Sequence, residues 1–165
     1  MLAKATVGRG FLEHPYFYID AASAMREACG APVCAIRGAE RYLLDTHMNL
    51  SEAFGDPLVV ENAQFFEDGE TIALDANPEF SLKAIHVPGH TTDSTMFYSA
   101  DAGIAFVGDT VFRGGMGTWR YPGGNRCDLI RSLRDKILLL PDGTMLYPGH
   151  TPETNGCKLP WASDA

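Results

Sequence analysis

Three short apolar runs in this chain end in the same way, with a glycine followed by a metal-type ligand. The endings read Val87-Pro88-Gly89-His90, Phe106-Val107-Gly108-Asp109 and Tyr147-Pro148-Gly149-His150. Glycine lets the backbone turn sharply at the end of a strand, and imidazole and carboxylate are ligand types of hydrolytic zinc sites. Three strands that end at one rim would bring these ligands together. The pattern therefore predicts a metal centre.

The composition is that of one loop-rich globular domain over residues 1–165, with 45% hydrophobic residues, 17 Gly and 10 Pro. Asp and Glu outnumber Lys and Arg by 21 to 13, a net charge of −8 that argues against a nucleic-acid partner. No apolar stretch approaches the roughly 20 residues that cross a bilayer. We expect no membrane partner, a cytoplasmic location, and reduced thiols for the four cysteines, which form no Cys-x-x-Cys pair.

Periodicity and capping signals predict two helices. The first covers residues 21–29, between an Asp20 cap and Gly30, and the second lies between Asn125 and Leu140. A buried strand over 33–36, a helical turn or two over 38–44 and an irregular surface loop over 45–55 are expected between them. Short strands are expected at 64–66 and 71–74, forming a meander, and at 80–87, 94–99, 104–107 and 144–147. This order indicates an α/β layered domain with its site on one edge of the sheets.

The three motifs, followed by a Gly-rich loop and an amphipathic helix in matching order, resemble the metallo-β-lactamase superfamily. Within it they are most similar to the glyoxalase II (hydroxyacylglutathione hydrolase) branch, over about residues 20–154. The resemblance implies an αββα sandwich that binds two metal ions at the sheet edge, usually zinc, with iron or manganese as alternatives. By similarity His90 ligates the first metal, Asp109 bridges both as the catalytic residue, and His150 ligates the second.

The resemblance also implies a reaction. A carboxylate can bridge two cations because each of its oxygens can face one, whereas a neutral imidazole serves one. Two cations at Asp109 would lower the pKa of a shared water towards neutrality, producing a metal-bound hydroxide that attacks a thioester or other small acyl substrate. The implied partner is thus a small molecule.

The chain departs from the family pattern in its first motif. Where His-x-His-x-Asp-His is expected, the sequence has His14 and then Tyr16 and Tyr18 near the places of the second histidine and the aspartate. An opening stretch of strands, about 50 residues in the family, is also missing, so we expect a truncated member that lacks part of its first sheet. His14, His90 and Asp109 would then hold the first metal, while the second keeps only Asp109 and His150. The count predicts one weakly held metal or none, unless a neighbouring chain completes the set.

The substrate-binding parts depart as well. Gly117-Thr118-Trp119-Arg120 stands where the family often has Gly-Arg-x-Asp, and the family's basic C-terminal helical region is absent, so specificity for glutathione thioesters is unsupported. We expect Trp119 and Tyr121 to cover a core edge rather than to line an acyl pocket. His47 and His86 are expected to be exposed or hydrogen-bonded residues rather than ligands.

Three hypotheses follow from these residues. The first, which we favour, is a metal-dependent hydrolase of the glyoxalase II-like type with impaired activity. The second is a non-catalytic remnant of that fold with an incomplete metal site, whose unpaired strand edge favours a homo-oligomer. The third, a module that binds an anionic ligand through the Gly-rich loop, is weaker because Gly114 to Gly117 lack a phosphate-binding fingerprint.

Overall fold

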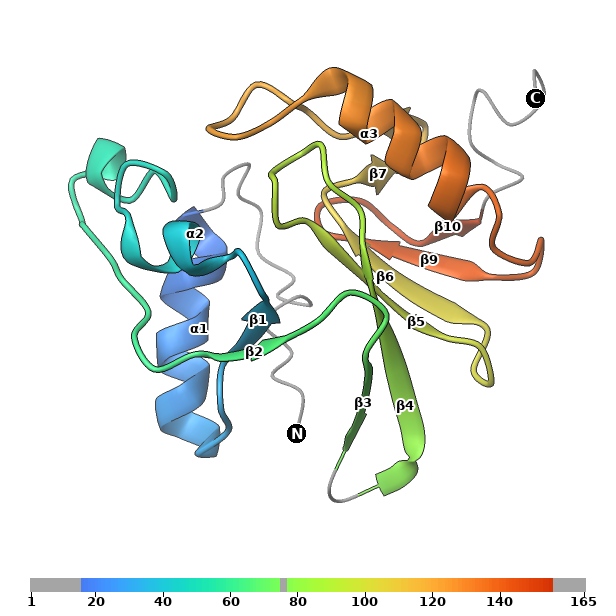
Figure 1. Cartoon of the computed structure of the whole chain (residues 1–165), viewed down its shortest axis with the longest axis horizontal. Coiled ribbons are helices and arrows are strands. Elements are labelled where there is room, and N and C mark those ends of the chain that lie inside the picture. The colour runs from blue at the N-terminus through green and yellow to red at the C-terminus, as the bar shows by residue number, and fades with distance from the viewer. Residues whose placement is uncertain (1–15, 75–76, 156–165) are drawn as a thin grey trace.

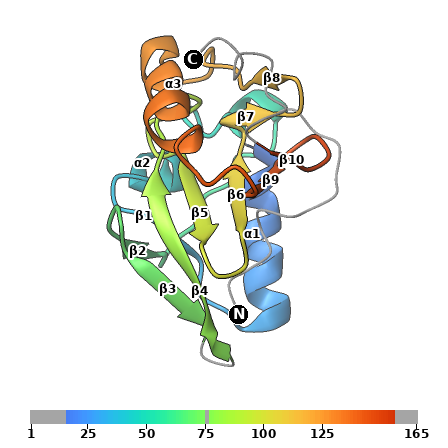
Figure 2. The ribbon, with the colours of Figure 1, turned by 90° about the vertical axis from the view of Figure 1, so that its right-hand side faces the viewer.

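The computed structural model describes residues 16–74 and 77–155. Its main sheet has six strands in the order β10-β9-β6-β5-β4-β3 (Figure 1). The strands are β3 (Thr71–Leu74), β4 (Asn77–His86), β5 (Thr95–Ser99), β6 (Ile104–Gly108), β9 (Met145–Pro148) and β10 (Thr154–Asn155). From β3 to β6 each strand runs antiparallel to the one before it (Figure 2), whereas β9 runs parallel to β6. The predicted strands of this sheet are confirmed.

A second, smaller layer precedes this sheet in the chain. It contains α1 (Tyr16–Cys29), α2 (Glu40–Leu44), the 3₁₀ turn η2 (Glu52–Phe54), and a parallel pair formed by β1 (Cys34–Ile36) and β2 (Gln64–Phe66). The meander prediction is therefore wrong for residues 64–66, because β2 pairs with β1 and not with β3. A three-residue apolar run gives no indication of which strand it pairs with. Here Gln64 of β2 pairs with Cys34 of β1, which lies 30 residues earlier in the chain.

Helix α1 begins five residues before the predicted start, which places Asp20 inside the helix instead of at its N-cap. Asp is favoured at an N-cap, but it is also tolerated inside a helix. No Gly or Pro interrupts residues 16–29, so the helix can start earlier. The predicted C-terminus is confirmed. Gly30 has a φ of 62° and its N–H donates to the Arg26 carbonyl at 2.9 Å, as expected for a left-handed residue that ends a helix.

The expected surface loop over residues 45–55 is only partly exposed. Asn49 and Ser51 have no exposed surface. The Asn49 amide donates to the carbonyls of Tyr42 and Leu58, both at 3.0 Å, and its side-chain oxygen accepts from Ser51 N–H at 2.9 Å. The backbone of an irregular segment has no helix or sheet to supply its hydrogen-bond partners, and these polar side chains supply them instead. Likewise, only Ile36 of the strand predicted as buried is fully buried.

The last helix covers the main sheet on the face opposite to β1 and β2. It consists of α3 (Arg126–Ser132) continued by the π-helical turn η3 (Leu133–Ile137), within the predicted range. Asn125 caps it, since its side-chain oxygen accepts from Cys127 N–H at 2.8 Å and Asp128 N–H at 3.2 Å. Two short strands, β7 (Val111–Phe112) and β8 (Gly115–Met116), form a hairpin within the Gly-rich loop. Their two-residue length leaves no periodic signal to predict them.

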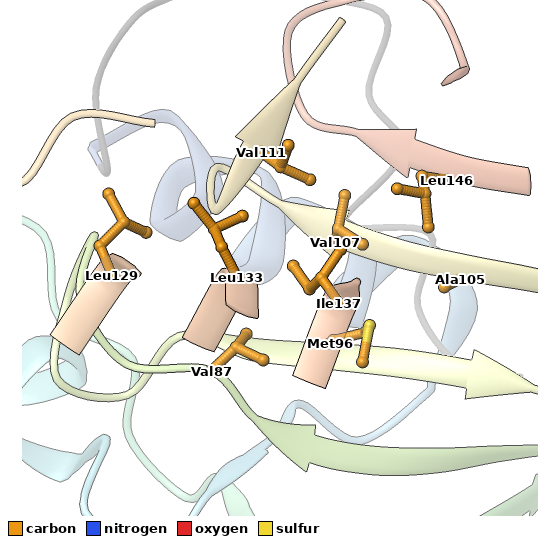
Figure 3. Packing of buried hydrophobic residues seen from close by; sticks show 9 residues of the cluster. All are labelled: Val87, Met96, Ala105, Val107, Val111, Leu129, Leu133, Ile137 and Leu146. Carbon is orange, nitrogen blue, oxygen red and sulfur yellow. The ribbon is translucent and has the colours of Figure 1, made fainter. Parts of the chain in front are cut away.

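The two faces of the main sheet belong to different cores. Figure 3 shows the larger core, in which Leu129, Leu133 and Ile137 of the last helix face side chains from the strands. Neighbouring residues of one strand point to opposite faces. Met96 therefore lies in this core, whereas Phe97 packs with Ile36 and Phe66 in the core between the two sheets. This layering of helix, sheet, sheet and helix confirms the predicted α/β sandwich.

Within the described ranges no helix combines the length and apolarity that a membrane span requires. The cysteines among these residues, Cys29, Cys34 and Cys127, are free thiols, as predicted.

Candidate metal centre

The three glycine-ligand endings come together at one end of the main sheet. Strands β6 and β9 are parallel neighbours, so Asp109 and His150 follow strand ends that lie side by side. The Gly149 N–H donates to the Gly108 carbonyl at 2.9 Å and keeps the two turns in register. His90 comes from the turn after β4. The predicted convergence of these three residues is thus observed.

The two imidazoles face the same carboxylate oxygen. The Nε2 atom of His150 lies 3.2 Å from Asp109 Oδ2, and the Nε2 atom of His90 lies 3.6 Å from that oxygen. The side chains of Asp109 and His90 are 6% and 9% exposed, while that of His150 is 21% exposed. The cluster is therefore shielded from solvent on the His90 side and open on the His150 side.

A backbone carbonyl sets the orientation of His90. Its Nδ1 atom lies 2.8 Å from the carbonyl oxygen of Thr118, in the Gly-rich loop. A carbonyl only accepts, so Nδ1 carries the proton and, in the neutral ring, Nε2 presents a lone pair towards Asp109. A proton or a cation can bind between this nitrogen lone pair and the carboxylate, because both groups donate electron density to it. Sequence reasoning missed Thr118 because a backbone carbonyl leaves no trace in residue type.

Aromatic rings pack beside both histidines. Tyr121 meets the His90 ring edge to face, with centroids 5.4 Å apart, and Phe112 lies 6.1 Å from the His150 ring. Trp119 packs against the larger core. The expectation that Trp119 covers a core edge is confirmed. His47 is exposed and His86 Nε2 lies 2.6 Å from the Thr92 carbonyl, which confirms that these two histidines are exposed or hydrogen-bonded.

Two glycines allow the close packing of the site. A Cβ atom on Gly89 would lie 2.2 Å from the N and Cα atoms of Leu129 in α3. A Cβ atom on Gly117 would lie 1.7 Å from the carbonyl oxygen of Asp109. Both contacts are with backbone, which cannot rotate away. The His90 turn can therefore pack against α3, and the Gly-rich loop against Asp109, only because these two positions lack side chains.

A cavity of about 290 Å³ opens beside the cluster, between the two sheets. His90, Asp109 and Asp93 lie on its wall with apolar residues of β1 and β5 such as Ile36 and Phe97. Thr91 Oγ1 donates to Asp93 Oδ1 at 2.6 Å. Burial nevertheless raises the pKa of the Asp93 carboxyl above its ordinary value, because desolvation outweighs that hydrogen bond. Asp93 was not predicted, although its place three residues after His90 was a usable signal.

The donor types suit a divalent cation, but the described residues do not complete a site. In residues 16–74 and 77–155 no group of three or more His, Cys, Asp or Glu side chains is arranged to hold a metal ion. His90 and His150 share one oxygen of Asp109 and leave the remaining coordination to other donors. The predicted ligand His14 lies outside the described residues.

The fold and the site together define an α/β sandwich with a histidine–carboxylate cluster at a sheet end. The chain belongs to the metallo-beta-lactamase superfamily, whose family model matches residues 21–150. This superfamily of metallo-hydrolases binds divalent metals.

Two relatives illustrate the sequence similarity. The probable metallo-hydrolase YqgX of Bacillus subtilis (strain 168) is 33% identical over 146 residues, which cover 87% of this chain and 68% of that protein. Hydroxyacylglutathione hydrolase GloC of Haemophilus influenzae (strain ATCC 51907 / DSM 11121 / KW20 / Rd) is 29% identical over 144 residues, covering 86% of this chain and 65% of that protein. The chain thus spans about two thirds of each relative.

Two crystal structures share the fold. The BLEG-1 B3 metallo-beta-lactamase superposes with a TM-score of 0.78 and 27% identity, covering 89% of this chain and 71% of that one. TTHA1623 in a di-iron-bound form superposes with a TM-score of 0.74 and 27% identity, covering 91% of this chain and 75% of that one. These similarities confirm the predicted fold class.

Proposed function

We propose that the chain is a metal-dependent hydrolase of the glyoxalase II-like type that acts on a thioester or another small acyl substrate. The observation that carries this proposal is the approach of His90 and His150 to one oxygen of Asp109, at 3.6 and 3.2 Å. The GloC relative, a hydroxyacylglutathione hydrolase by name, supports the choice of substrate class. A cytoplasmic location stays a prediction.

We assign His90, Asp109 and His150 as metal ligands, with His14 as a further donor and Asp109 as the catalytic carboxylate. Zinc is the proposed ion, and iron and manganese are alternatives, since one structural relative binds two irons. A divalent ion bound here would supply Lewis acidity and a more acidic water.

The chain's own residues prepare this chemistry. The Thr118 carbonyl fixes the His90 ring, so that its free nitrogen faces Asp109. The near-complete burial of Asp109 keeps bulk water away from its carboxylate, which strengthens its interaction with any positive charge. The neighbouring cavity of about 290 Å³ has room for a small acyl group with His90 and Asp109 on its wall.

The alternative is a non-catalytic member of the superfamily that acts as an oligomeric scaffold. One observation favours it, namely that the described residues complete no three-ligand group. It predicts background metal content, no thioester turnover and self-association in solution.

The proposal is tested by metal analysis and turnover measured on the same preparation. Protein purified without chelator is examined by elemental mass spectrometry and by hydrolysis of the acetyl thioester of N-acetylcysteamine. We expect bound metal and turnover in the wild type, and loss of both in Asp109→Asn.

The matched control is Asp142→Asn, since Asp142 is exposed in the turn before β9 and should retain both properties. Light scattering gives the mass of each variant. Background metal and background turnover in the wild type would refute the hydrolase, and a monomer with neither property would refute both candidates.

A further inference from the structure

The cavity beside the candidate centre is bordered by two small apolar cores. Ile36 and Phe66 belong to the core between the two sheets, whereas Ala22, Val33 and Leu43 belong to a second core that includes α1. All five residues line the cavity, whose volume is about 290 Å³. Protein interiors leave few voids larger than a water molecule, so a space of this size between apolar groups suits an apolar ligand.

The wall of the cavity changes from polar to apolar along β5. This strand starts at Thr95, shortly after the His90 turn, and runs antiparallel to β6, which leads to Asp109. It therefore runs away from the histidine–carboxylate cluster. Phe97 lies two residues further along, about 6–7 Å from Thr95, and its ring packs edge to face on Phe66 with centroids 5.6 Å apart. The cavity thus has the cluster at one end and hydrocarbon side chains further in.

The polar side chains on the wall already have partners within the protein. Asn49 makes the three hydrogen bonds described above. Thr91 Oγ1 lies 2.6 Å from Asp93 Oδ1 and 2.8 Å from Ser94 Oγ, and Thr95 Oγ1 donates to the Asp93 carbonyl at 2.9 Å. A polar ligand would have to replace these bonds, which yields little net free energy.

The charge of the wall also excludes an anionic occupant. Among the described residues that line the cavity there are two carboxylates, Asp93 and Asp109, and no Lys or Arg. A carboxylate taken into the cavity would therefore lose its hydration without gaining a cationic partner. The occupant that fits this wall is neutral and apolar.

The volume sets the size of that occupant. A cavity of about 150 Å³ lined by Leu, Ile and Phe binds benzene, which has six carbons. The present cavity has about twice that volume, which corresponds to a chain of about eight to twelve carbons.

We propose that this cavity binds the hydrocarbon chain of a medium-chain acyl thioester, with the acyl carbonyl at the end formed by His90 and Asp109. The inference rests on the proposed hydrolase function and narrows its substrate class from any small acyl compound to a neutral, unbranched one. Hydrolysis forms a bond between a water oxygen and the acyl carbon and breaks the carbon–sulfur bond. The leaving sulfur takes one proton of that water, so the products are a thiol and a medium-chain carboxylic acid.

A series of acyl thioesters of N-acetylcysteamine provides the kinetic test. The acyl chains have from about two to fourteen carbons, and each is used below its critical micelle concentration. We expect kcat/KM to rise about fourfold for each added methylene, through KM, because every methylene is transferred from water to the cavity. The rise should end at about eight to twelve carbons, when the cavity is full. A flat profile over the shorter chains would contradict the proposal.

A variant that fills the cavity locates the effect. Ala35 of β1 lines the cavity. Ala35→Leu adds an isopropyl group to the wall and should shorten the longest favoured chain by about three carbons, since the cavity cannot hold both. Ala73→Leu is the matched control, because Ala73 is exposed on β3 and does not line the cavity. The same shift in both variants would contradict the assignment of the cavity.

A cysteine on the wall gives a binding measurement that needs no turnover. Cys34 is an exposed free thiol that lines the cavity, whereas the exposed thiols of Cys29 and Cys127 do not line it. Alkylation of each cysteine by iodoacetamide is followed by peptide mass spectrometry, with the S-octyl or the S-ethyl thioether of N-acetylcysteamine present. Neither thioether can be hydrolysed. At ten times its Kd the S-octyl compound should slow alkylation of Cys34 about tenfold and leave Cys29 and Cys127 unchanged, and the S-ethyl compound should protect none of them.

These measurements separate the acyl site from the hydrolase. Selective protection of Cys34 by the S-octyl thioether would support the acyl site even if no thioester were hydrolysed. Hydrolysis that is independent of chain length, with no protection of Cys34, would overturn the acyl site while leaving the hydrolase intact.

Discussion

Replacement of Gly89 by alanine tests whether the His90 turn must touch the backbone of α3. The added Cβ would lie 2.2 Å from Leu129 N and Cα, far inside van der Waals contact. The helix cannot retreat freely, because Asn125 N–H donates to the Gly89 carbonyl at 2.8 Å and Ser132 Oγ donates to the Pro88 carbonyl at 2.7 Å. Gly89 also has a φ of 139°, which L side chains rarely adopt.

The expected cost combines two terms. A non-glycine residue in a sparsely populated backbone region costs about 1–3 kcal/mol, and forcing atoms into a packed region costs about 1–3 kcal/mol. Gly89→Ala should therefore lower the free energy of unfolding by about 4 kcal/mol, a large part of the roughly 5–15 kcal/mol typical of a domain.

Two other glycines separate these terms in urea unfolding followed by circular dichroism. Gly103 has a φ of 61° but open space around its Cβ position, so Gly103→Ala should cost about 1–2 kcal/mol from strain alone. Gly143 has open space and no positive φ, so Gly143→Ala should stay within about 0.5 kcal/mol of the wild type. A Gly89→Ala loss no larger than that of Gly103→Ala would refute the steric argument.

Three further substitutions test buried polar groups and the helix cap. Asn49→Ala removes three buried hydrogen bonds and should cost about 3 kcal/mol in urea unfolding, whereas the exposed His47→Ala should change little; similar losses would contradict this. Asn125→Ala should cost about 1 kcal/mol in the same assay, and no loss would mean that the cap is dispensable. Burial raises the pKa of Asp93, so the folded state holds this proton more tightly than the unfolded state, and the resulting stability is present at low pH and lost as pH rises through the raised pKa. Asp93→Asn should therefore raise the melting temperature at about pH 8, with the gain disappearing near about pH 3; a gain independent of pH would contradict the assignment.

Local signals were sufficient where an element depends on its own residues. The apolar spacing of Leu129, Leu133 and Ile137 placed the last helix, and Gly30 placed the end of the first. Pairing was not predictable in the same way. The partner of β2 depends on how Phe66 and Ile36 pack in the core between the sheets, which involves residues distant in the sequence.

The candidate site was likewise only partly predictable from the sequence. Repeated Gly-ligand endings in the sequence pointed to His90, Asp109 and His150 as candidate ligands, because strand termini and ligand types are local properties. The approach of both histidines to one Asp109 oxygen, and the Thr118 carbonyl that contacts His90 Nδ1, depend on the register of β6 with β9 and on the course of the Gly-rich loop. Those arrangements result from packing between distant segments, which only the tertiary structure determines.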